Sequence, residues 1–109
     1  MILDDLPLVQ ITEEDKKYLE EFTECIFLSM NYTQLRTLKN LPIMSKLERI
    51  DLNDNSIEDG LDLIVANFHD LRTLKISNNK IKDFQQIEHL KNLKNLKVLD
   101  LSGNPISFN

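Results

Sequence analysis

The segment LRTLKISNNKI, residues 71–81, contains the pattern that decides the fold. Apolar side chains occupy its first, fourth and sixth positions, asparagine the ninth and isoleucine the eleventh. Matching segments begin at residues 25, 47 and 96, so the pattern occurs four times, at intervals of 22, 24 and 25 residues. In the first copy, Cys25 replaces the leading leucine and Thr33 the asparagine. Agreement at five positions in four segments is not a chance match, and it identifies an array of leucine-rich repeats.

Each position of the repeat has a physical role. The fourth and sixth residues share one face of a short strand, because strand side chains alternate in direction. The asparagine stands where the chain turns and can satisfy backbone groups that would otherwise be buried without partners. A single coil is too small to bury its own apolar face, so neighbouring coils stack. The sequence therefore predicts an α/β leucine-rich repeat solenoid, a curved right-handed coil with a parallel sheet on its concave side.

The convex side is predicted from the residues between the repeats. Residues 38–44 show little helix signal, whereas residues 61–68 are long and apolar enough for about two helical turns. From residue 84 to residue 93 apolar side chains recur every three positions, which favours 3₁₀ or α geometry. We therefore expect short helical or 3₁₀ segments on the convex side of the two longer repeats.

Residues 1–24 precede the first full repeat. Thr12 and the three acidic residues after it predict an N-cap and a capping box, with a helix that runs to about Phe22. Three side chains of this helix are expected to be buried: Tyr18, Leu19 and Phe22. The apolar residues before the helix are assigned to the trailing part of an earlier coil: Met1, Leu3 and Leu8.

The chain of 109 residues is long enough for one domain, and we assign residues 1–109 to a single leucine-rich repeat domain. Solenoids need terminal units with a polar outer face, and no such unit precedes residue 1 or follows Ile106. We therefore interpret the chain as a fragment of a longer protein that lacks its caps. The alternative is that one end docks on a partner.

Charge is distributed unevenly along the chain, whose net charge is −5. Residues 1–24 contain eight acids and two lysines, residues 46–71 seven acids and two bases, and residues 72–97 seven bases and two acids. The bases of residues 72–97 are scattered over the turns, the convex side and the segments that lead into the strands, and they form no continuous basic face. We therefore expect a solvated surface and not a nucleic-acid site. No apolar run is long enough to span a membrane, and no membrane partner is expected.

The outward side chains of the strands are the candidate partner-binding face. They are Phe27, Ser29, Asn31, Arg49, Asp51, Asn53, Thr73, Lys75, Ser77, Val98, Asp100 and Ser102. Asp51 and Asp100 are expected to flank Lys75 on successive strands. We favour a self-neutralising charge ladder over an interaction row for a charged partner. Phe27, with Tyr32 nearby, is the best candidate for an anchor, although either ring could instead pack under the preceding loop.

Motifs for catalysis, cofactors or metals are not found in the sequence. Residues 51–62 imitate an EF-hand loop, but Ser56 stands where glycine is needed and Asp62 where a bidentate glutamate is needed. Cys25 lies in a core position and is expected to be buried and unreactive, and a single cysteine suits a reducing compartment. His69 and His89 lie in different coils without further ligands at metal spacing. We expect no enzyme activity, no cofactor, no metal and no small-molecule substrate.

Three stretches carry a more specific likeness: Leu41-Pro42, residues 55–61 leading to Leu71, and residues 79–88 leading to residues 96–101. In order and spacing they resemble the acidic leucine-rich nuclear phosphoprotein 32 family, including its 24- and 25-residue repeats. The likeness covers residues 18–104. The family's acidic tail is not found in the chain.

The resemblance implies an adaptor of the nucleus and cytoplasm. Family members bind histones and chromatin factors, inhibit histone acetylation, and inhibit a type-2A serine/threonine phosphatase. Proteins of these classes are therefore the expected partners. An alternative is a structural subunit of a ribonucleoprotein, because a spliceosomal leucine-rich A-prime subunit shares the Asn104-Pro105 ending and similar repeat lengths.

Overall fold

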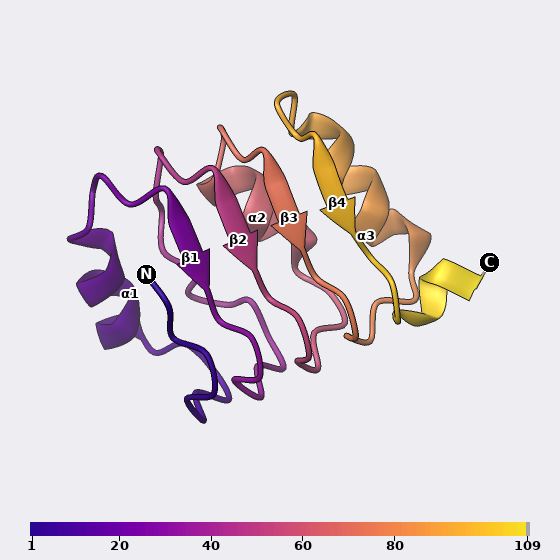
Figure 1. Ribbon diagram of the computed structural model, residues 1–109, viewed down its shortest axis with the longest axis horizontal. Helices are drawn as coiled ribbons and strands as arrows, with labels where there is room; N and C mark the ends of the chain where they lie inside the picture. The colour runs from indigo at the N-terminus through magenta and orange to yellow at the C-terminus, as the bar shows by residue number, and fades with distance from the viewer. Residues whose placement is uncertain (109) are drawn as a thin grey trace.

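The strands of the repeats form one parallel sheet along the side of a stack of coils. The computed structural model describes residues 1–108, with side chains to residue 106. Strands β1 (Phe27–Ser29), β2 (Arg49–Asp51), β3 (Thr73–Lys75) and β4 (Val98–Asp100) lie side by side in chain order (Figure 1). Leu28, Ile50, Leu74 and Leu99 pair in register. The predicted solenoid and its parallel sheet are confirmed.

The inward side chains of the coils form one continuous core. The fourth and sixth residues of the three earlier repeats are inaccessible to solvent, and most of the convex leucines and isoleucines are buried. Asn55, Asn79 and Asn104 are buried beside this core, and each links its own coil to the coil before it. The Oδ1 of Asn79, for example, accepts from the backbone N–H of Ile57 at 3.0 Å, and its Nδ2 donates to the carbonyl of Leu52 at 2.9 Å. The asparagines therefore replace backbone partners that the turns remove.

In every repeat, the residue before the ninth position has the left-handed backbone conformation. The φ angles are 55° at Tyr32, 60° at Asp54, 54° at Asn78 and 75° at Gly103, with 67° at Asp5 in the segment before the first repeat. Asn, Asp and Gly tolerate this conformation, whereas a bulky tyrosine adopts it at a cost. Since Asp and Asn fill most of these positions, the solenoid turns with only two glycines.

Helices cover the convex side of the two longer repeats. They are α2 (Leu61–Asn67) and α3 (Phe84–His89), the latter continuing into the 3₁₀ helix η1 (Leu90–Asn92). Residues 38–44 contain no helix, as predicted. A second 3₁₀ helix, η2 (Pro105–Phe108), follows the last turn and was not expected from the sequence.

The first helix, α1 (Glu13–Glu20), begins with the predicted capping box. The backbone N–H of Asp15 donates to Thr12 Oγ1 and that of Thr12 to Asp15 Oδ2, both at 3.0 Å. The expected burial is wrong for two of three side chains: Leu19 is buried, but Tyr18 is 59% and Phe22 38% exposed. Because α1 contacts the coils along one face only, the neighbouring stripe stays in solvent. The two rings pack edge to face with centroids 5.3 Å apart.

The segment before α1, residues 1–11, adds a single bridge to the edge of the sheet. Ile2 forms a parallel bridge with Ser29, and the backbone N–H of Leu3 donates to the Ser29 carbonyl at 2.8 Å. Met1, Leu3 and Leu8 pack against the core. The burial expected for Cys25 is wrong, because this side chain is only partly covered. Its counterparts Leu47 and Leu71 lie between two complete coils and are fully buried, whereas Cys25 lies at the end of the stack.

Candidate protein-binding surface

The twelve candidate residues lie along one side of the sheet, which we call the sheet face, and three of them are buried there: Ser29, Asp51 and Ser77. They form three columns across the strands, in the predicted register: Phe27, Arg49, Thr73 and Val98; Ser29, Asp51, Lys75 and Asp100; and, just beyond the strands, Asn31, Asn53, Ser77 and Ser102. Parallel strands lie about 4.8 Å apart, so neighbouring members of a column are close enough to act together on one partner.

The third column is tied into the fold by hydrogen bonds. The backbone N–H of Asn53 donates to Asn31 Oδ1, and that of Ser77 to Asn53 Oδ1, both at 2.8 Å. Asp4 continues the column in the first segment, where its Oδ1 accepts from Ser29 Oγ at 2.6 Å and from the Asn31 N–H at 2.8 Å. Sequence reasoning missed Asp4, although its place two residues after Ile2 matches that of Asn31 after Ser29. These side chains are committed to the structure and offer a partner little.

Arg49 is the centre of the accessible part of the sheet face. Its Nε and one terminal nitrogen donate to the two oxygens of Asp51, both at 2.9 Å, and its guanidinium carbon lies 4.9 Å from the centroid of the Phe27 ring. The bonds to Asp51 raise the pKa of Arg49 above its usual range. The Asp51 side chain is 8% exposed, whereas that of Arg49 is 45% exposed. A charged planar group is thus held at the surface between a ring and a carboxylate.

The predicted charge ladder across the strands is wrong in its pairing. Lys75 lies between Asp51 and Asp100 in the register, yet among the described residues it forms no ion pair within 4.0 Å with either. Asp51 pairs instead with Arg49 of its own strand, because the arginine fork binds both carboxylate oxygens at once. Asp100 accepts from the hydroxyl and the backbone N–H of Ser102, at 2.7 and 3.0 Å.

The Asp100 carboxylate supplies a prediction about pH. Hydrogen bonds from the Ser102 hydroxyl, then from its backbone N–H, lower the pKa of Asp100, with a smaller contribution from the charge of Lys75. A lowered carboxyl pKa stabilises the fold above the unfolded value of about 3.9, and this stabilisation is lost as the pH falls through the folded pKa. We expect Ser102→Ala to raise the pKa of Asp100 towards about 3.9 in an NMR titration of its carboxyl carbon. An unchanged pKa, or the same change in Ser45→Ala, would contradict this assignment.

No metal site is found among residues 1–108, where no three His, Cys, Asp or Glu side chains are placed to share an ion. None of the helices in this range combines the length and apolar character needed to cross a membrane. Cys25 is the only cysteine, and its Sγ donates to the Phe27 carbonyl at 3.2 Å. On the sheet face, the exposed side chains include Arg49, Val98 and Ser102, and Phe27 and Lys75 are partly exposed.

These features define a leucine-rich repeat protein with a sheet face suited to binding another protein. The family model of leucine-rich repeats in two copies matches residues 45–91 and 69–109, and the chain belongs to this family. Within it, the chain is similar to an acidic leucine-rich nuclear phosphoprotein 32-related protein of Plasmodium falciparum, with 37% identity over 111 residues. The match includes the whole chain and 40% of that relative, so the chain spans about two-fifths of its length.

Two solved structures are similar in fold. One is the Drosophila melanogaster SNF/U2A′ complex, with a TM-score of 0.73 and 24% identity over 99% of this chain and 61% of that one. The other is an internalin, inlF, of Listeria monocytogenes, with a TM-score of 0.51 and 27% identity over 79% of this chain and 30% of that one. Both support the leucine-rich repeat architecture.

Proposed function

We propose that this chain is the protein-binding module of a nuclear adaptor and engages basic proteins, histones among them, through the sheet face. The observation that carries the proposal is the 37% identity, over the whole chain, to a relative named as an acidic nuclear phosphoprotein. The same resemblance adds chromatin regulators and a type-2A phosphatase as partners, and the cytoplasm as a second location. Inhibition of histone acetylation and of that phosphatase are its implied activities.

The sheet face itself is close to electrically neutral. Arg49 and Lys75 balance Asp51 and Asp100, and the Asp51 carboxylate is already neutralised by Arg49. The sheet face therefore contributes an anchor to binding. This anchor is the half-exposed Arg49 over the Phe27 ring, with apolar Val98 in the same column. Arginine and aromatic residues dominate the binding energy of protein interfaces.

Attraction of a basic partner comes from the turns beside the sheet. Glu58 and Asp59 are exposed between β2 and α2, and Asp62 is exposed in the first turn of α2. Among the described residues none of the three forms an ion pair. Charges at the rim of an interface act mainly on the association rate, while buried or stacked anchors act on the dissociation rate. The proposal thus assigns different kinetic roles to the acidic turn and to Arg49.

Surface plasmon resonance with core histones and immobilised chain tests this division. We expect Arg49→Ala to speed dissociation by about tenfold or more, because truncation of an anchor acts on the dissociation rate. The double variant Glu58→Gln/Asp59→Asn should slow association and reduce its salt dependence. Phe84→Ala, at an exposed aromatic residue on α3 away from the strands, is the control and should change neither rate.

Two results would overturn the proposal. If histones bind no better than an unrelated basic protein, histones are not the partner. If Arg49→Ala and Phe84→Ala have equal effects, the sheet face is not the binding surface. RNA binding can be measured with the same immobilised chain. The ribonucleoprotein alternative, which rests on the Asn104-Pro105 ending and the repeat lengths, predicts RNA binding that weakens steeply with salt.

A further inference from the structure

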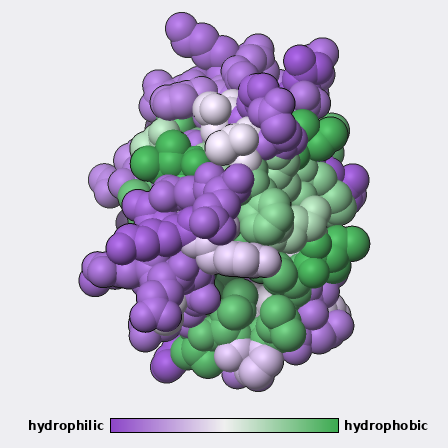
Figure 2. Space-filling model, turned by 90° about the vertical axis from the view of Figure 1, so that its left-hand side faces the viewer, coloured by the Kyte–Doolittle hydropathy of each residue, from purple (hydrophilic) through white to green (hydrophobic). Residues whose placement is uncertain are grey.

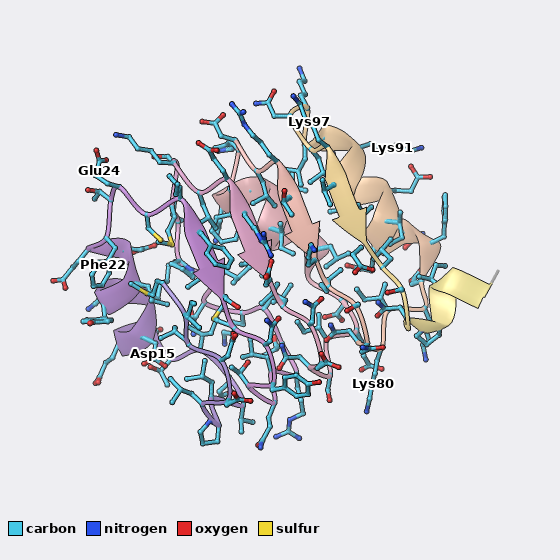
Figure 3. The ribbon with its side chains drawn as sticks, in the orientation of Figure 1. Asp15, Phe22, Glu24, Lys80, Lys91 and Lys97 are labelled. Atoms are coloured by element: carbon cyan, nitrogen blue, oxygen red, sulfur yellow. The ribbon has the colours of Figure 1, made fainter. Side chains whose placement is uncertain are left out.

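A second surface lies at the N-terminal end of the stack, apart from the sheet face. A groove of about 160 Å³ lies between the first segment, residues 1–11, and α1. Its lining is apolar except for one carboxylate: Leu3, Leu6, Leu8, Ile11, Asp15, Tyr18, Leu19 and Met30. Figure 2 shows this end of the molecule, where apolar side chains gather and hydrophilic ones border them. Asp15 marks the groove on α1 in Figure 3.

The size and lining of the groove suit one large apolar side chain. An apolar cavity of about 150 Å³ holds a benzene molecule and excludes water. The groove has nearly this volume, and its rim includes Leu6, 45% exposed, and the Tyr18 ring. Its one carboxylate, that of Asp15, already accepts the Thr12 N–H in the capping box. A phenylalanine or leucine side chain from a partner would therefore meet apolar atoms almost throughout.

The charges around the groove specify what must accompany this side chain. Asp5, Glu13, Glu14 and Glu21 are exposed, and none of them forms a hydrogen bond or ion pair through its carboxylate with another described residue. Glu14 and Glu21 lie four residues before and three after Tyr18, so both share its stripe of the helix. Residues 1–24 hold eight acids against two lysines, and Figure 3 places the lysines Lys91 and Lys97 at the opposite end.

We infer that the groove binds a basic segment of a partner protein that inserts one large apolar side chain. The apolar lining recognises the anchor, and the unpaired carboxylates recognise lysine or arginine on either side of it. This site involves residues of α1, residues 1–11 and Met30, and none of the twelve residues of the sheet face. It therefore stands whether or not the sheet face binds histones.

Two labelled peptides test the inference by fluorescence anisotropy. One is a short peptide of lysine and alanine with a single central phenylalanine, and the other carries alanine in its place. We expect the phenylalanine peptide to bind at least about tenfold more tightly, as for a buried aromatic anchor. Tyr18→Ala and Leu6→Ser should remove this difference. Glu14→Gln/Glu21→Gln should weaken both peptides and reduce the salt dependence.

Controls separate the groove from other surfaces and from unfolding. Phe84→Ala and Arg49→Ala should leave the preference for the phenylalanine peptide intact, and thermal unfolding checks that each variant is folded. Amide shifts in NMR spectra should be centred on Leu3, Leu8 and Leu19. Equal affinity for the two peptides, or shifts confined to β1–β4, would overturn the inference. So would dimerisation in sedimentation velocity that Leu6→Ser abolishes, since the occupant would then be a second copy of this chain.

Discussion

Replacing Asn55 with alanine should lower the free energy of unfolding by about 4 kcal/mol, since each buried polar group left without a partner costs about 1–3 kcal/mol. The Oδ1 of Asn55 accepts from the backbone N–H groups of Thr33 at 2.9 Å and Leu35 at 3.2 Å. Its Nδ2 donates to the carbonyls of Met30 at 2.9 Å and Leu52 at 3.1 Å. Alanine can replace none of these bonds. The N–H groups of Thr33 and Leu35 are then left without a hydrogen-bond partner, whereas the Met30 and Leu52 carbonyls keep one donor each, Thr33 Oγ1 and Asn79 Nδ2.

Urea unfolding followed by circular dichroism measures this effect, with Asn95→Ala as the matched control. Asn95 is exposed and forms no side-chain hydrogen bond with another described residue, so the control should lie within about 0.5 kcal/mol of the parent. Since a domain of this size is stable by only about 5–15 kcal/mol, the Asn55 variant should be folded but close to its limit. A loss below about 1 kcal/mol would mean that water replaces the amide in the turn.

The solenoid could be predicted because its determinants repeat in the sequence. The register of Leu28, Ile50 and Leu74 follows from the spacing of the repeats, since every coil solves the same packing problem. The twelve outward residues follow from the alternation of side chains along a strand. The helices of the convex side also follow, because the longer repeats have the apolar residues to bury one helical face.

What could not be predicted depends on contacts that have no period. Whether Tyr18 is buried or exposed depends on the angle at which α1 packs against the coils, and the local sequence pattern does not predict that angle. Arg49 could reach Asp51 on its own strand or a partner across the sheet, and only the positions of the side chains decide between them. The groove beside α1 arises from the same end of the stack, where the repeat pattern stops and the packing is no longer dictated by a neighbouring coil.

Phe68→Ala should have an effect as large as that of Asn55→Ala, about 3–5 kcal/mol, because truncating a buried aromatic ring removes its apolar burial and leaves a cavity. Phe68 is among the largest side chains that are fully buried, and its backbone N–H donates to the Ile64 carbonyl at the end of α2. Beside it, Asn67 fastens α2 to the preceding coil through a 2.9 Å bond from Nδ2 to the Leu41 carbonyl. The ring therefore fills the core where two coils are joined. After its removal, the surrounding side chains cannot easily move in to fill the cavity.

Phe84→Ala is the same chemical change at a ring that is 59% exposed, and it should cost less than about 1 kcal/mol. The difference between the two variants in urea unfolding isolates the effect of burial from that of the residue type. The dependence of the free energy on urea should stay unchanged in both, because the coils share one core and unfold together. Equal losses in the two variants would contradict the placement of Phe68. A smaller urea dependence in Phe68→Ala alone would instead mean that the coils on either side of it can unfold separately.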